Sequence, residues 1–114
     1  MIVHLVLFRP KASLSSSEQR ALVASIERAA ASIATVRRFR VGRALTDAPA
    51  YQLQGFPDMP YVAILEFEDR EALDDYLEHQ MHGELGRRFN EGAEAALIYD
   101  YEVHDASEAA TRLL

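Results

Sequence analysis

Histidine is the side chain best suited to acid–base chemistry near neutral pH, and this sequence has four histidines. His79 and His82 stand three positions apart in the stretch LEHQMHGELG, where one helical pattern gives way to another. His4 interrupts an otherwise apolar stretch at the start of the chain. Burying an imidazole without a hydrogen-bond partner is costly, so His4 is the most informative of these residues.

Asp100 interrupts the last apolar stretch as His4 interrupts the first, and it lies between Tyr99 and Tyr101. If the first and last stretches are strands of one sheet, the Asp100 carboxylate can serve the His4 imidazole and fix its tautomer. Two interpretations stay open on the residues alone, a core pair that fixes packing and a functional site. A metal triad of His4, His82 and Asp100 is a weak third, because there is no H-E-x-x-H motif and no acidic ligand cluster. We therefore expect no metal.

The junction histidines and Tyr76 also allow a structural and a catalytic interpretation. His79 suits the end of a helix, where a histidine lies near the negative end of the dipole. His82 precedes Gly83, where the chain re-enters the domain, and this place favours a side chain that faces a cavity. Tyr76 lies on the apolar side of its predicted helix, so its ring packs and its hydroxyl finds a partner or holds a substrate carbonyl.

The composition excludes several classes of protein. The chain has no cysteine, so disulfides, cysteine-ligated zinc and a cysteine nucleophile are impossible. Its net charge of -6 lacks the basic surface of a nucleic-acid binder. No apolar run approaches the roughly 20 residues that span a bilayer, and no signal-peptide pattern is present. We expect a cytoplasmic, soluble protein with no nucleic-acid or membrane partner. The arginines of residues 37–43 are more typical of a solvated strand edge than of an anion site.

The elements that position these residues follow from periodicity and from turn signals. At 114 residues the chain is expected to form one domain. A Ser15–Glu18 capping box begins the first helix, and Asp69 caps the second. The predicted strands are residues 1–8, 39–45, 61–68 and 96–103, and the predicted helices are residues 13–36, 70–78 and 81–95. Residues 46–60 form a long loop of the kind that is often functional, and residues 104–114 form a polar tail, helical or disordered.

This order predicts an α+β, ferredoxin-like fold, a four-stranded antiparallel sheet with helices on one face. The first strand is apolar on both faces, with Ile2, Val6 and Phe8 on one and Val3, Leu5 and Leu7 on the other. Helices cover only one face, and a large exposed apolar sheet face is abnormal for a monomer. The second face is therefore expected to pack on a second copy of the chain. The predicted assembly is a homodimer.

The stretches HLVLFRPK, RRFRVGR, YVAILEFEDREALDDYLEHQMHGELGRRF and YDYEV together resemble the stress-responsive α/β-barrel (Dabb) domain family. The resemblance covers nearly all of residues 1–103, with 104–114 left as a C-terminal tail. It implies ferredoxin-like protomers that pair into a dimeric α/β barrel. That expectation agrees with the apolar residues found on both faces of the strands.

Within this family the chain is similar to proteins of the olivetolic acid cyclase type, which close a polyketide by aldol chemistry without a cofactor. The resemblance implies a pocket formed by His4, Tyr76, His79, His82 and Asp100. It implies His82 as the base, Asp100 as the group that orients it, and Tyr76 as the donor to a carbonyl oxygen. Two positions depart from that pattern, because Gln80 replaces a proline of the junction and Tyr61 stands where the cyclase has a histidine. We expect Tyr61 and His79 to bind the substrate.

The function expected from these features is binding, and conversion, of a small apolar, aromatic or carbonyl-bearing metabolite by cofactor-free acid–base catalysis. Two alternatives stay open. One is a non-enzymatic stress or assembly protein whose function is carried by the assembled oligomer. The other is a cofactor-free monooxygenase of the dimeric α/β-barrel type, which is an analogy of fold alone.

Overall fold

The computed structural model describes residues 1–45, 55 and 57–114. Most of the predicted loop 46–60 lies outside these described residues. The elements in chain order are β1 (Ile2–Pro10), α1 (Ser16–Ser32), β2 (Arg38–Arg43), β3 (Tyr61–Phe67), α2 (Arg70–Glu78), α3 (Gln80–Gly92), β4 (Ala93–Glu102), the 3-10 helix η2 (Ala106–Glu108) and α4 (Ala109–Leu113).

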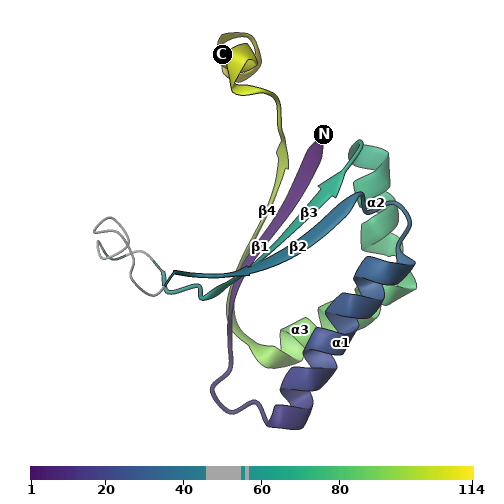
Figure 1. Ribbon diagram of the computed structural model, residues 1–114, viewed down its shortest axis with the longest axis vertical. Helices are drawn as coiled ribbons and strands as arrows, with labels where there is room; N and C mark the ends of the chain where they lie inside the picture. The colour runs from purple at the N-terminus through teal and green to yellow at the C-terminus, as the bar shows by residue number, and fades with distance from the viewer. Residues whose placement is uncertain (46–54, 56) are drawn as a thin grey trace.

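The four strands form one sheet in the order β2-β3-β1-β4, and all three pairings are antiparallel. Helices α1, α2 and α3 lie together on one face of the sheet (Figure 1). This is the ferredoxin-like arrangement, so the predicted fold class is confirmed. In the sheet, His4 of β1 is paired with Asp100 of β4 on one side and with Leu65 of β3 on the other.

Helix α1 begins as the sequence predicts. The Ser15 side chain accepts a hydrogen bond from the backbone N–H of Glu18, and the Glu18 carboxylate accepts one from the backbone N–H of Ser15. These hydrogen bonds hold the pKa of the Glu18 carboxyl below its ordinary value. The helix is shorter than the predicted span of 13–36, because the chain leaves helical geometry at Ile33. Ile33 is buried in the core all the same.

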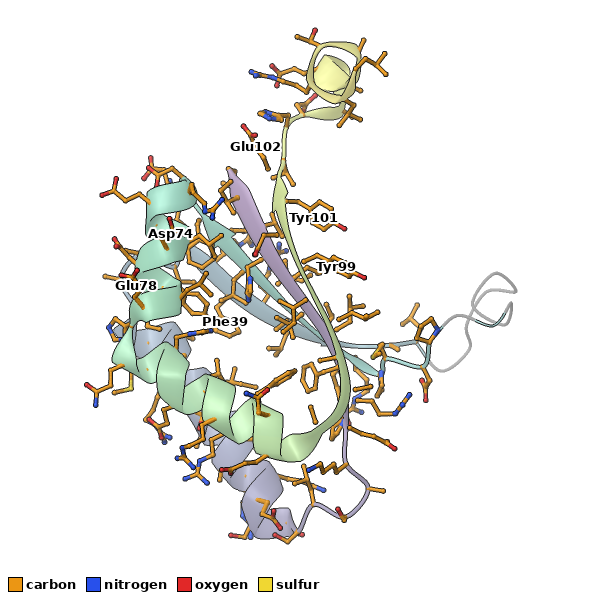
Figure 2. All side chains as sticks on the ribbon, turned by 180° about the vertical axis from the view of Figure 1, so that it is seen from behind. Phe39, Asp74, Glu78, Tyr99, Tyr101 and Glu102 are labelled. Atoms are coloured by element: carbon orange, nitrogen blue, oxygen red, sulfur yellow. The ribbon has the colours of Figure 1, made fainter. Side chains whose placement is uncertain are left out.

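Helices α2 and α3 meet at a single residue. The Asp69 side chain caps α2 by accepting from the N–H of Ala72, 2.9 Å away. His79 then ends α2 and begins α3 in an extended conformation. The interruption divides one helical stretch into two helices that run in different directions (Figure 2).

The predicted helix 81–95 is wrong at its end. Helix α3 stops at Gly92, and residues from Ala93 onward belong to β4. Gly92 is buried against Leu14, and its carbonyl oxygen accepts a hydrogen bond from the N–H of Lys11. Ladder pairing of Ala93 with Pro10 overrides the helix propensity of the following alanines, because tertiary contacts outweigh small intrinsic preferences.

The core lies between the helices and the sheet. Its buried residues are Ala29, Ile33, Ala63, Leu65, Phe67, Leu73 and Tyr76. On β3 the residues at 63, 65 and 67 alternate inward, as expected for a strand with one covered face. This core fixes β1, β3 and α2, which carry three of the candidate site residues.

The opposite face of the sheet carries no helix. It presents Val3, Leu5 and Leu7 from β1, and Tyr99 and Tyr101 from β4. The two tyrosines are 44% and 51% exposed, and they project from β4 on the side away from the helices (Figure 2). The sheet therefore carries apolar side chains on both faces, as the strand sequences predict.

Strand β2 forms one edge of the sheet, and its Arg38 and Arg40 are exposed. Both guanidinium groups lie near the Glu66 carboxylate, at 3.9 and 3.8 Å, so the arginine segment is a solvated strand edge, as predicted. The segment after β4 runs beyond the sheet and ends in α4, well away from the three packed helices (Figure 1). No helix in the described residues has both the length and the apolar character that crossing a membrane requires.

Candidate functional site

A cavity of about 240 Å³ lies between the sheet and α3. Its polar lining residues are His4, Tyr76, His82 and Asn90. The rest of its lining is Val6, Phe8, Ile26, Phe39, Ala63, Leu65, Leu85, Gly86, Phe89 and Ile98. A mostly apolar cavity with a few polar groups is the usual form of a small-molecule site.

His82 is held in one tautomer by the end of α2. Its Nδ1 lies 3.0 Å from the carbonyl oxygen of Leu77. A carbonyl oxygen only accepts, so Nδ1 carries the proton and the neutral ring keeps an unprotonated Nε2. Burial lowers the pKa of His82 below its ordinary 6.5, against the opposing effect of the Leu77 carbonyl and with a smaller lowering from His4. The imidazole is therefore mainly neutral at pH 7.

Tyr76 stands between the two histidines. Its ring centroid lies 4.6 Å from that of His82 and 5.8 Å from that of His4. The residue is 2% exposed, and its hydroxyl has no hydrogen-bond partner among the described residues. Burial raises the pKa of Tyr76 well above its ordinary value of 10.0, so the phenol stays protonated and remains a hydrogen-bond donor.

His4 and Asp100 form the pair that the sequence predicts. His4 Nδ1 donates to the Asp100 Oδ1 across the β1–β4 ladder, at 2.6 Å. The His4 side chain is buried, whereas the Asp100 side chain is 46% exposed at the edge strand. The structure thus pairs Asp100 with His4, and Leu77 takes the place of the group that holds His82.

His79 and Tyr61 lie outside the cavity lining. The His79 Nδ1 accepts a hydrogen bond from the N–H of Met81 at 3.0 Å, so this imidazole caps α3. Tyr61 stands at the start of β3, where its ring packs on Phe8 with centroids 5.6 Å apart. Of the six expected site residues, His4, Tyr76 and His82 therefore line the cavity, and Asp100 is joined to them through its hydrogen bond to His4.

Two contributors to the site were missed from the sequence. The Leu77 carbonyl acts through the backbone, which no residue pattern reveals, although the last carbonyls of any helix lack intrahelical partners and need a donor. Asn90 lies two helical turns after His82 on α3, and this spacing was the available signal. No cluster of three or more histidine, cysteine or acidic side chains able to hold a metal occurs in the described residues.

A second cavity, of about 420 Å³, lies at the end of the sheet where β1 begins. Its lining residues are Met1, Ile2, Glu68, Asp69, Arg70, Leu73, Asp100, Tyr101 and Glu102. It is the larger of the two, but it reaches none of the histidines. The smaller cavity is the candidate site, because acid–base groups converge there.

The fold has many relatives among solved structures. A protein from Arabidopsis thaliana is 21% identical, with a TM-score of 0.76 over 93% of this chain and 98% of that chain. A dimeric ferredoxin-like protein from Jannaschia sp. CCS1 is 25% identical, with a TM-score of 0.71 over 90% of this chain and 98% of that chain. The hydroxynitrile lyase of Passiflora edulis is 13% identical, with a TM-score of 0.76 over 92% and 94%.

A search of curated proteins finds no match to the chain. The family model of the stress responsive A/B barrel domain, Dabb, matches residues 2–103. That range takes in all four strands, helices α1 to α3 and every residue of the candidate site. The chain therefore belongs to the Dabb family.

Proposed function

We propose that this protein binds a small carbonyl compound in the cavity between the sheet and α3 and moves a proton on it without a cofactor. The observation that carries the proposal is the convergence of His4, Tyr76 and His82 on one small apolar space, with Asp100 bonded to His4 from outside its lining. The enzymatic interpretation is favoured over an assembly role because the neutral base and the buried donor line the same cavity. The hydroxynitrile lyase of similar fold indicates that this fold accommodates enzymes.

His82 is the proposed base. Its Nδ1 proton is engaged by Leu77, so Nε2 is the atom available to take a proton from the carbon next to a carbonyl group. The electron pair of the broken C–H bond moves to the carbonyl oxygen and gives an enolate. The lowered pKa keeps His82 unprotonated at neutral pH, ready to accept that proton.

Tyr76 is the proposed donor to the oxygen on which this charge develops. Its hydroxyl is unengaged among the described residues and sits in a buried environment, where a hydrogen bond to an anion is strong. His4 borders the same space, and its hydrogen bond to Asp100 holds the His4 ring beside Tyr76. Return of the proton from His82 to carbon or to oxygen completes the cycle with no net change in the enzyme.

The active form is proposed to be a homodimer that packs the open sheet faces together. The supporting observation is the apolar face of Val3, Leu5, Leu7, Tyr99 and Tyr101, which no element of the same chain covers within the described residues. The relative from Jannaschia is itself described as dimeric. The cavity lies on the other side of the sheet, so dimerisation leaves it in place.

The proposal is tested by hydrogen–deuterium exchange. Phenylacetone in deuterated buffer is incubated with the protein, and loss of the signal of the protons beside the carbonyl is followed by proton NMR. We expect faster exchange with wild type than with buffer, and exchange at the buffer rate with His82→Ala. His79→Ala is the matched control, because that imidazole lies three residues away but caps a helix. Equal rates for wild type and His82→Ala would contradict the proposal.

A further inference from the structure

The lining residues of the candidate cavity extend along β1 and α3, and the two ends of this lining differ in chemistry. From His4 to Phe8, β1 advances about 13 Å, and from His82 to Asn90, α3 advances about 12 Å. The histidines mark one end. At the other end the rings of Phe8 and Phe89 meet edge to face, with centroids 5.2 Å apart. A ligand that fills this space is longer than the carbonyl group that the histidine end receives.

Gly86 lies between the two ends on α3. A Cβ built at this position meets no atom within 4 Å, so the missing side chain leaves open space beside the cavity that Gly86 lines. A glycine in the interior of a helix destabilises it relative to other residues. Gly86 differs from Gly83, the other α3 glycine with open space at its Cβ, because only Gly86 lines the cavity.

Asn90 supplies a hydrogen-bonding group at the far end. It is exposed, and its side-chain amide makes no hydrogen bond with the described residues. An amide offers both a donor and an acceptor, and it carries no charge. On the opposite wall, Ile98 of β4 is 54% exposed, although it belongs to the covered side of the sheet. Asn90 and Ile98 are thus the exposed residues of the cavity lining.

We propose that the substrate is an elongated carbonyl compound with a hydroxyl group at its far end, and that Gly86 and Asn90 determine this specificity. The carbonyl lies at Tyr76 and His82, the apolar body passes Gly86, and the hydroxyl binds the Asn90 amide. This inference rests on the proposed function, which places the carbonyl at the histidine end. It adds the length and the second polar group of the substrate.

The test compares two ketones that differ in one hydroxyl, benzylacetone and para-hydroxybenzylacetone, by NMR titration of the protein. Wild type is expected to bind the hydroxylated ketone about three- to tenfold more tightly, the effect of one neutral hydrogen bond. Asn90→Leu is expected to abolish this difference. Gly86→Leu is expected to weaken binding of both ketones by at least about tenfold, because the new side chain occupies the open space.

Gly83→Leu is the matched control. Gly83 is also an α3 glycine whose Cβ would meet no atom within 4 Å, but it does not line the cavity. Gly83→Leu raises the helix propensity of α3 by the same amount as Gly86→Leu. It is expected to leave the affinities for both ketones within about twofold of wild type. Gly86→Ala, the smaller change, is expected to fall between wild type and Gly86→Leu.

Equal affinities of the two ketones for wild type, absence of binding of either ketone, or equal effects of the two glycine-to-leucine changes would each overturn this inference. Proton exchange of phenylacetone is a separate readout, because it is scored against His82→Ala and depends on neither the far-end hydroxyl nor Asn90. The proposed function is judged on that exchange. The two failures are therefore distinguishable.

Discussion

The imidazole of His82 and the carbonyl oxygen of Leu77, 3.0 Å apart, join the start of α3 to the end of α2. The contact satisfies a carbonyl at the end of a helix and at the same time determines which ring nitrogen of His82 stays free. One hydrogen bond thus serves the fold and the candidate chemistry together. It also makes the protonation state of His82 the natural variable to test.

The rate of phenylacetone exchange is expected to depend on the neutral form of His82. Because burial lowers the pKa of His82 below 6.5, exchange should stay high at neutral pH and fall only as the pH drops below 6.5 through the lowered value. A pH series of exchange rates measures the midpoint. A midpoint above 6.5 would contradict the assignment of His82 as the base.

The lowered pKa of His82 also makes the folding stability depend on pH. In the window between the lowered pKa and 6.5, the unfolded chain binds more protons at this position than the folded chain. His82 therefore contributes to a loss of stability as the pH falls below 6.5. Urea unfolding across this range should show a smaller loss for His82→Gln than for wild type.

Replacing Tyr76 with phenylalanine should slow exchange with little effect on folding. The ring packs against Phe67 at a centroid distance of 5.2 Å, and phenylalanine keeps this packing. Loss of one preorganised donor to a developing oxyanion costs on the order of 100-fold in rate. Exchange rate and thermal midpoint are measured together. A lowered thermal midpoint with an unchanged rate would indicate a purely structural tyrosine.

Replacing Asp100 with alanine should destabilise the protein by about 1 kcal/mol, because it leaves a buried imidazole N–H without its acceptor. The figure is modest because Asp100 itself is 46% exposed, so water can replace part of the lost contact. Denaturant unfolding measures the change. Glu102→Ala, on the same strand and side but away from His4, is the control and should change stability by less than about 0.5 kcal/mol.

A lysine at Tyr99 should break the proposed dimer. Tyr99 is 44% exposed in the protomer, so the change alters the open sheet face without disturbing the core. Two copies of a new charge facing each other across a two-fold interface repel and remain poorly solvated. Sedimentation should show a monomer, whereas Val23→Lys, on the solvent side of α1, should sediment as wild type does.

Much of this fold follows from local patterns. The capping box at Ser15 and Glu18, the Asp69 cap and the alternating strands depend on neighbours in the sequence, and all are present. The end of α3 was not predictable in this way, since it depends on a ladder between Pro10 and Ala93. Local propensity does not contain that information.

The candidate site was predictable only in part, for the same reason. The pairing of His4 with Asp100 was predictable, because each is a polar residue in an apolar strand. The Leu77 carbonyl, the cap made by His79 and the space beside Gly86 are properties of the backbone path. Such properties appear only when the helices are placed against the sheet.

The central place of β1 in the sheet has a consequence for biogenesis. Of the four strands described, β1 is synthesised first and pairs with β4, which is synthesised last, and the His4–Asp100 contact spans 96 positions. Contacts this distant in the chain form late and slow the folding of small domains. The apolar strand β1 therefore has no partner on this side until residues 93–102 have been synthesised, and until then the cavity lacks the wall that Ile98 provides.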